Sequence, residues 1–407
     1  MNKFNALLCA ASIAAGLVAA PALAQTKPIR IGVPAAMQLQ VGRDTQDSIK
    51  MAIDDINAKG GVLGRKLEMV VADETENPET GISAIKKLTA DEKVDVLIGG
   101  YTSGVTLAQL PHISAAKTIY LGIGAASPAI NAKVKTDYDN YKYIFRVGPI
   151  HSGHQARELT NFIGTFVKGE LGITKIAIVG ENAKWVQDLV PLLKKGSIEA
   201  GMDVRVTEFF DAQISDFSPL FAKVKDSGAQ YLIVVLSHAS SDVFAKQWYD
   251  SRFPMPYGGI DVKSMDGDFC DRVGGKSVGE MAVNLAVRAP ITPKTIPFWD
   301  EFRKRTTRQP VYTAFGANDA VYIYAEAVQR AKSTDPNAVI KELEKTNYTG
   351  IPGIIQFDET HDVKPGTATY KGPAYILAQW RDKCAREVVY PKSMRTADFV
   401  YPSWVKK

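Results

Sequence analysis

The stretch Ile29-Arg30-Ile31-Gly32-Val33 decides the fold, because it opens a regular alternation of strand and helix patterns. It reads as a short buried strand. Apolar residues spaced three, four and seven positions apart follow it, which predicts a helix with one buried stripe. That stripe consists of Ile49, Ala52, Ile53 and Ile56. The helix is predicted to end at Lys59-Gly60-Gly61, because glycine favours helix termination.

The same alternation continues further along the chain. Strands are predicted at 67–72 and 94–100, and a helix that carries Ile82, Ile85 and Leu88 lies between them. Strands that alternate with helices form an open parallel sheet covered by helices on both faces. Such sheets bind ligands at the carboxyl ends of their strands. The predicted fold class is therefore α/β, with a doubly wound parallel sheet.

A second series of strands and helices begins near Arg146. Its strands are predicted at 175–180, 204–210 and 230–236, and its helices at 151–168, 186–200, 217–227 and 242–250. Towards the end, the pattern predicts helices at 313–332 and 338–343 and strands at 354–357 and 375–380. Two sheets in one chain predict two lobes that face each other across a cleft. A cleft between domains is a common place for a small-molecule site.

An amino-terminal leader precedes this pattern. Met1-Asn2-Lys3 is a short positive start, no charge lies between Phe4 and Ala20, and Pro21-Ala22-Leu23-Ala24 offers small residues to a signal peptidase. The apolar stretch is shorter than the ~20 residues that span a bilayer. We therefore expect residues 1–24 to be a cleavable signal peptide that directs export to the periplasm.

Charge and cysteine content narrow the class of protein. The formal net charge is +5 over 407 residues, and basic residues are dispersed among acids, so nucleic acid is not an expected partner. Cys270 and Cys384 are the only cysteines after the leader. In an oxidising compartment a disulfide between them is plausible, and two buried free thiols are an equally open alternative.

No phosphate-binding or metal-binding motif is complete. Gly274-Gly275-Lys276-Ser277 resembles the end of a phosphate-binding loop, but that loop requires glycine where this chain has Cys270. His151 and His154 could share a helix face, yet no partner ligand accompanies them, so a solvated helix start is the favoured interpretation. We expect no enzymatic activity, no cofactor and no metal.

Three segments carry a family resemblance. Residues 52–67, followed by Asp73, resemble the amino-terminal signature of type I periplasmic binding proteins, and most closely the leucine/isoleucine/valine-binding family of ABC importers. Ile98-Gly99-Gly100-Tyr101-Thr102-Ser103 and Gly124-Ala125-Ala126-Ser127-Pro128 continue the match. Similar segments in the second half extend the resemblance over nearly the whole chain after the leader.

The resemblance implies a particular architecture and mechanism. Three crossings would join lobe 1, residues 28–147 plus 289–353, to lobe 2, residues 148–288 plus 354–407. Solute would bind in the open cleft and favour the closed form, to the extent of its differential affinity for that form. The closed monomer would then dock on ABC permease subunits in the inner membrane.

In lobe 1, Ser103 is the firmest candidate for solute contact. The resemblance implies that its hydroxyl receives a solute carboxylate. A helix amino terminus at the same place also suits an anion, and a plain N-cap is the alternative. Thr102 and Tyr101 flank it as further candidates.

A second lobe 1 segment is implied to offer backbone groups to the solute head. It comprises Ala125, Ala126 and Ser127. The family often has a hydroxyl where this chain has Ala126, and Ser127 is the candidate substitute. A tight turn closed by Pro128 is an equally open interpretation.

In lobe 2, Trp185 matches an aromatic residue that closes over the solute in the family, and a core or exposed aromatic is the alternative. Ser237 and His238 end an apolar strand where the family carries another aromatic residue, and strand-end capping is an equally good interpretation.

Asp261 decides the solute class. Amino-acid binders use a lobe 2 carboxylate for the ligand ammonium, and strict alignment puts Ile260 at that place, with Asp261 one residue away. If Asp261 points into the cleft, a branched-chain or related amino acid fits, and this is the first expectation. If it does not, an aromatic or aliphatic carboxylic acid without an amine, or an amide, is favoured. A sensor that regulates a partner protein is the rival from another class.

Overall fold

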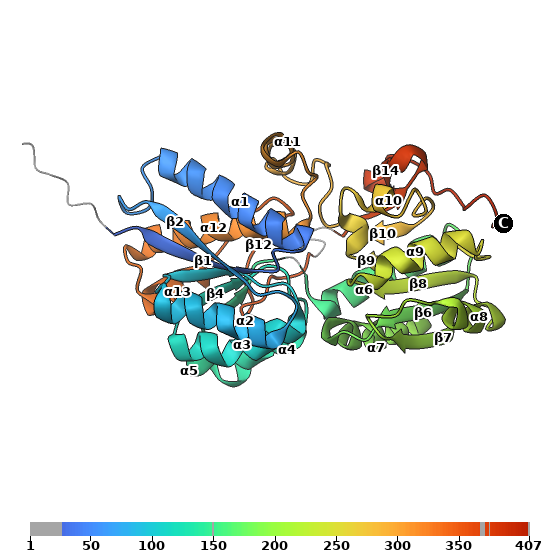
Figure 1. Ribbon diagram of the computed structural model, residues 1–407, viewed down its shortest axis with the longest axis horizontal. Coiled ribbons are helices and arrows are strands. Elements are labelled where there is room, and N and C mark those ends of the chain that lie inside the picture. Colours follow the sequence, from blue (N-terminus) through green and yellow to red (C-terminus); the bar gives the residue numbers. More distant parts are fainter. Residues whose placement is uncertain (1–26, 149, 367–370, 374, 406–407) are drawn as a thin grey trace, which may run out of the picture.

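The computed structural model describes residues 27–148, 150–366, 371–373 and 375–405, so the expected leader 1–24 lies outside the described residues. Figure 1 shows two α/β lobes side by side. The chain as far as β5, together with α12 and α13, lies in one lobe, and the chain from α6 to β10, together with β14 of the carboxyl-terminal segment, lies in the other. Among the described helices, none is both long and apolar enough to cross a membrane.

The first lobe is built on a five-stranded sheet in the order β2-β1-β3-β4-β5. All neighbouring strands in this sheet run parallel. The strand order reverses beside β1, so the carboxyl ends of β1 and β3 form the place where ligands bind in open α/β sheets. The strands are β1 (Ile29–Ala35), β2 (Leu67–Asp73), β3 (Val96–Gly99), β4 (Ile119–Gly122) and β5 (Ile144–Arg146).

Helices cover both faces of the first sheet. On one face, Ile31 and Val33 pack with apolar residues of α1 (Gln40–Ala58), α12 (Tyr312–Ala331) and α13 (Pro336–Leu343). The other face packs against the remaining helices of this lobe. These are α2 (Pro78–Lys86) with a π-helical turn (Lys87–Asp91), α3 (Ser103–Ala116), α4 (Pro128–Thr136) and α5 (Tyr138–Tyr141).

The second lobe contains a seven-stranded sheet in the order β14-β13-β10-β9-β8-β6-β7. The five strands from β10 to β7 run parallel to one another, and β13 runs antiparallel to both of its neighbours, β10 and β14. The doubly wound α/β fold predicted from the sequence is confirmed, and β13 adds an antiparallel strand at one edge. The short connection between β13 and β14 joins antiparallel neighbours, as short connections do. The strands are β6 (Lys175–Glu181), β7 (Asp203–Phe210), β8 (Tyr231–Leu236), β9 (Tyr257–Asp261), β10 (Met281–Val283), β13 (Leu377–Trp380) and β14 (Arg386–Tyr390).

Two core clusters lie on the faces of the second sheet. One face packs on α6 (Ser152–Phe162), its π-helical extension (Ile163–Lys168) and α7 (Lys184–Glu199). The other packs on α8 (Ser218–Asp226) and α9 (Ser240–Asp250). The remaining short pieces are α10 (Phe269–Arg272), α11 (Thr295–Thr306), and 3₁₀ turns at Lys263–Met265, Asp382–Cys384 and Lys392–Met394.

The segment after α13 packs on the first lobe for longer than the sequence suggests. β11 (Tyr348–Thr349) and β12 (Ile354–Ile355) form a small hairpin. Phe357 and Val363 pack in the core of the first sheet. The predicted change of lobe at 353/354 therefore falls too early by this packing, because the segment reaches the second sheet only at β13. The other lobe limits stay a prediction.

A disulfide fixes this terminal segment to the second lobe. Cys270 of α10 and Cys384, which lies between β13 and β14, are joined with their Cα atoms 5.6 Å apart. Cys270 is fully buried and packs with Phe269 and Trp380. Of the two alternatives that the sequence leaves open, the structure contains the disulfide.

Candidate functional site

A small cavity lies where the two lobes meet. It has a volume of about 40 Å³. Its walls come from segments that directly follow strands: 101–103 after β3, 237–238 after β8 and 262–265 after β9. The lining residues are Tyr101, Thr102, Ser103, Gly124, Ala126, Ile150, Gln155, Trp185, Ser237, His238, Val262, Met265, Leu285 and Tyr312.

The first wall contains the amino terminus of α3. Thr102 is the N-cap residue, but its side chain makes no capping hydrogen bond. The amide of Thr106 donates to the carbonyl of Thr102 at 3.0 Å, so the three preceding amides come before the helical hydrogen-bond pattern. Such an end attracts negative charge, since free N–H groups and the positive end of the helix dipole coincide.

Ser103 is oriented by two backbone amides. Its Oγ accepts hydrogen bonds from Ala126 N at 3.0 Å and Ser127 N at 3.1 Å, and the residue is 2 % exposed. Both lone pairs of the hydroxyl are thereby used, so only its hydrogen is left to donate. A hydroxyl that can only donate is suited to a carboxylate.

Only Ala126 of the 125–127 segment lines the cavity, and the segment is held by bonds within the first lobe. The Arg146 guanidinium donates to the carbonyls of Ser127 at 2.6 Å and Ala126 at 3.3 Å. The backbone amides of Ala126 and Ser127 donate to Ser103 Oγ. The backbone groups that were predicted to bind the solute at these two positions are therefore already bonded within the protein. Ala125 packs in the first-lobe core, and neither it nor Ser127 lines the cavity.

Ser127 instead connects the lobes. Its Oγ donates to Asp188 Oδ2 of α7 at 2.6 Å and accepts from Ala129 N at 3.3 Å as the N-cap of α4. Asp188 also forms an ion pair with Lys184. The structure is therefore a closed arrangement, in which Ser127 contributes a contact between the lobes at the edge of the cleft.

The second wall is formed by Trp185 and Ser237. The indole Nε1 of Trp185 donates to Ser237 Oγ at 3.2 Å, and its carbonyl accepts from Ser152 Oγ at 2.9 Å. Trp185 is 8 % exposed and lines the cavity, at the place expected of a covering aromatic. Ser237 also accepts at its carbonyl from the hydroxyl of Tyr101 at 3.2 Å.

His238 forms an ion pair with a buried carboxylate that the sequence analysis did not name. Nδ1 of His238 lies 2.8 Å from Glu181 Oε1, and its amide donates to Glu181 Oε2 at 3.0 Å. Burial acts to lower the pKa of His238, but Glu181 outweighs it and raises that pKa above its usual value. Burial likewise acts to raise the pKa of Glu181, and His238 outweighs it and lowers that pKa. Across the cleft, His238 Nε2 lies 3.7 Å from Glu76 Oε1 of the first lobe.

Asp261 does not line the cavity. Its Oδ1 accepts from Lys263 N at 3.0 Å and Ser264 N at 3.2 Å, and the residue is fully buried. Its carboxyl interacts with that of Glu280, which is also fully buried, and burial raises the pKa of both groups. The carboxylate that an ammonium would need is thus held inside the second lobe by the protein itself.

The comparison with known proteins agrees with this geometry. The family model described as "Periplasmic binding protein" matches residues 28–383. The chain belongs to this family. The leucine-, isoleucine-, valine-, threonine- and alanine-binding protein of Pseudomonas aeruginosa is 24 % identical, over 88 % of this chain and 92 % of its own length. Leu/Ile/Val-binding protein homolog 1 of Brucella melitensis is 27 % identical, over 84 % and 89 %.

Solved structures share the fold of this periplasmic binding protein. A putative branched-chain amino acid ABC transporter protein from Silicibacter pomeroyi matches with a TM-score of 0.80 and 23 % identity, over 93 % of this chain and all of the other. LivJ from Streptococcus pneumoniae, in complex with isoleucine, gives 0.74 and 21 %, over 89 % and 100 %. A solute binding protein from Rhodopseudomonas palustris, in complex with 3,4-dihydroxybenzoic acid, gives 0.73 and 19 %, over 87 % and 93 %. The type I periplasmic binding fold is therefore established for this chain.

Several residues of the site were missed from the sequence. Glu181 directly follows a predicted buried strand, so its place at the ligand-binding edge of the sheet was a usable signal. Gln155 lies in the middle of a predicted helix, and nothing in the pattern marks it. Tyr312 begins α12 and donates its hydroxyl to the carbonyl of Gly124 at 3.2 Å.

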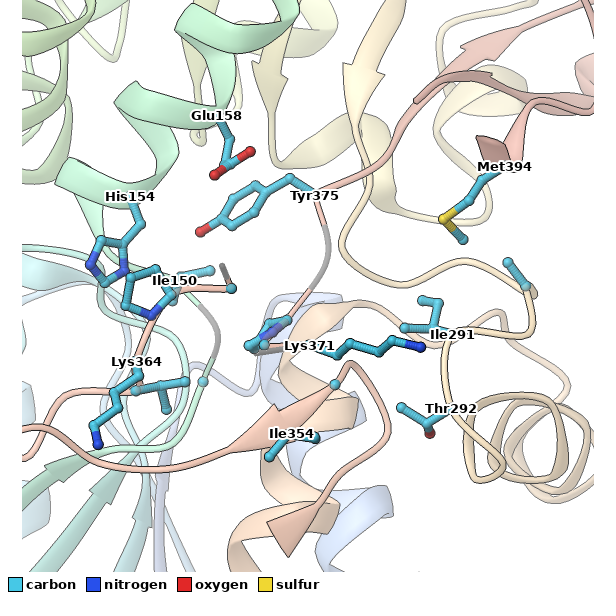
Figure 2. A pocket seen from close by; sticks show the side chains of 18 of the residues that line it. Ile150, His154, Glu158, Ile291, Thr292, Ile354, Lys364, Lys371, Tyr375 and Met394 are labelled. Atoms are coloured by element: carbon cyan, nitrogen blue, oxygen red, sulfur yellow. The ribbon is translucent and has the colours of Figure 1, made fainter. Parts of the chain in front are cut away.

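A larger cavity of about 950 Å³ lies beside the segments that connect the lobes. In Figure 2, His154 and Glu158 of α6 face this space, and Lys371 extends into it from the opposite side. The rings of His151 and His154 stack at 4.2 Å, and His151 Nδ1 caps α6 by accepting from the amides of Gly153 and His154. The described residues contain no cluster of three or more metal ligands.

Proposed function

We propose that this protein is the solute-binding component of an ABC importer. It captures a small carboxylate between its lobes and delivers it to permease subunits in the inner membrane, after the leader 1–24 has been cleaved and the chain exported as a monomer. The Ser103 hydroxyl carries this proposal, because it can only donate and stands beside the amino terminus of α3.

The proposed solute has no ammonium group. Two of the protein's own acids near the cavity are engaged elsewhere: Asp261 accepts from Lys263 N and Ser264 N, and Glu181 pairs with His238. Burial of an uncompensated ammonium costs several kcal/mol, so a carboxylic acid or amide without an amine fits better. The dihydroxybenzoate bound to the Rhodopseudomonas neighbour supports an acid of this kind.

A branched-chain amino acid is the second candidate. The names of the Pseudomonas and Brucella relatives and the isoleucine bound to the LivJ neighbour favour it. For that candidate to hold, an ammonium must displace His238 from Glu181 or pair with Glu76.

A ligand screen separates the two candidates. Thermal shifts are measured with aliphatic and aromatic carboxylates, their amides, and leucine, isoleucine and valine, because a solute that binds only the folded state raises the melting temperature. Calorimetry then gives the affinity of each hit. We expect stabilisation by acids and none by the amino acids; the reverse pattern would replace the proposed solute class by amino acids. Uptake by cells that lack the chain tests delivery to the permease.

A further inference from the structure

The side chain of Gln155 lines the interlobe cavity without a hydrogen-bonding partner. Gln155 extends from α6 of the second lobe and is 4 % exposed. Its Oε1 is buried and has no partner, and no other hydrogen bond of its carboxamide occurs with the described residues. A buried amide that stays unpaired is costly, so such groups are normally satisfied.

The opposite wall contains a second group of this kind. Thr102 of the first lobe lines the same cavity, and its Oγ1 is buried without a partner among the described residues. Thr102 directly precedes Ser103, so it belongs with the end of the cavity assigned to the carboxylate. Gln155 comes from the other lobe, so the two unpaired groups approach a bound solute from opposite walls of the cavity.

The surface between these groups is largely apolar. It is formed by Ile150, Val262, Met265 and Leu285, together with aromatic rings. The other polar side chains that the second lobe contributes to the cavity are already engaged: Trp185 donates to Ser237, and His238 pairs with Glu181. Among the described residues that the second lobe contributes to the cavity, Gln155 is thus the side chain with both a donor and an acceptor free for a ligand.

We propose that Gln155 determines specificity by recognising a second polar group on the solute. The solute is then a short carboxylate whose other end bears a hydroxyl, oxo or amide group, with an apolar middle. This rests on the proposed function, because it requires the carboxylate to be bound at α3. A site built to hydrogen-bond a ligand group rejects the analogue that lacks it, since its own polar groups would be left unpaired.

Pairs of acids that differ in one polar group test the inference. Suitable pairs are lactate and propionate, 3-hydroxybutanoate and butanoate, and 4-hydroxybenzoate and benzoate. Calorimetry on the full-length mature protein measures the affinity for each member. We expect the polar member of at least one pair to bind more than about tenfold tighter, as a well-made buried hydrogen bond allows.

Gln155→Met isolates the residue, because methionine keeps the length of the side chain and removes its hydrogen bonds. We expect the preference within that pair to fall to about twofold or less, with the affinity for the unsubstituted acid retained or improved. Gln187→Met on the exposed side of α7 is the matched control and should keep the wild-type preference. A melting curve checks that both variants fold.

The failures can be told apart. Equal binding of both members of every pair by the wild-type protein overturns the role of Gln155 and leaves the proposed function standing. If Gln155→Met still prefers the polar member of the pair, the role of Gln155 is overturned as well, even if the solute class is right. If no acid binds and amino acids do, the proposed solute class fails, and the inference falls with it.

Discussion

The hydroxyl of Tyr101 in the first lobe donates a hydrogen bond of 3.2 Å to the carbonyl of Ser237 in the second, directly beside the cavity. Both residues directly follow strands whose carboxyl ends face each other. This contact exists only while the lobes are together, so it contributes to the closed form and not to the stability of either lobe.

Tyr101→Phe should therefore weaken solute binding without changing the fold. Loss of the bond leaves the Ser237 carbonyl unpaired in the closed form, which costs ~1–3 kcal/mol, or roughly five- to 150-fold in affinity. Calorimetry measures the affinity, and small-angle scattering measures the shift towards the open form. If both remain at their wild-type values, the contact does not control closure.

Ser103→Ala should reduce carboxylate affinity by more than about tenfold, because a charge-assisted hydrogen bond worth ~1.5–3 kcal/mol is lost. The neutral amide analogue of the same solute is the control ligand and should lose less, since its bond carries no charge. Ser103 Oγ also accepts hydrogen bonds from the amides of Ala126 and Ser127. An equal loss of affinity for both ligands would mean that the substitution acts by removing these two bonds and not a bond to the carboxylate.

The Glu181–His238 pair makes stability depend on pH. The pKa of His238 is raised from 6.5, so its stabilisation is present below that value and lost as pH rises through the folded pKa. The pKa of Glu181 is lowered from 4.5, so its stabilisation is present above that value and lost on acidification. The pair contributes most between these two limits.

His238→Gln should therefore narrow the change in melting temperature between pH 6 and pH 9. The wild-type protein also has buried acids such as Glu74, whose pKa burial raises to about 7, so it loses stability over this range for other reasons. The difference between variant and wild type at each pH is the quantity that reports the pair. If the melting temperatures of variant and wild type differ by the same amount at every pH, the Glu181–His238 pair does not cause the pH dependence.

Asp261→Asn should leave solute affinity within about twofold, because Asp261 lies outside the cavity and the proposed solute has no ammonium. The same variant removes one of two adjacent buried carboxyls, which relieves repulsion on Glu280 at high pH. We expect melting at pH 8 to be unchanged or higher than in the wild type. A large loss of affinity would instead indicate an amine-bearing solute.

Reduction of the Cys270–Cys384 disulfide should destabilise the protein by roughly 2–5 kcal/mol, as for other native disulfides. The sequence separation is 114 residues, so the loop released in the unfolded chain is long. Urea unfolding with and without reductant measures the change. Thiol titration of the denatured, unreduced protein is the control: it should find no free thiol, and two would contradict the disulfide.

Continuous apolar runs made most of the fold predictable. β1, β6 and β8 are such runs, and the helix at 313–332 was predicted from one repeated face and is α12. β9 was not predicted from its pattern, because Gly258-Gly259 interrupts it. α11 was missed because its apolar residues Phe298, Trp299 and Phe302 are separated by charges that belong to its exposed face.

Apart from Trp185, which the family resemblance indicated, the cavity residues predicted from the sequence lie just after strands. Tyr101, Ser103, Ser237 and His238 meet that condition, and all four line the cavity. The orientation of Asp261 could not be predicted, because neighbouring strand residues point to opposite faces and a shift of one residue reverses the answer. Gln155 could not be predicted, since its role depends on which face of α6 meets the other lobe.

The two carboxyl-terminal strands also affect the order in which the second sheet can form. β10 gains its outer neighbour only when β13 arrives, nearly a hundred residues later in the chain. Until then β10 is an open sheet edge, the kind of surface that invites pairing with other chains. A polypeptide threaded amino end first through a translocation channel would keep that edge unpaired until its final stretch emerged. Truncation that removes β13 and β14 should therefore cause aggregation during secretion, because β10 then stays an open edge.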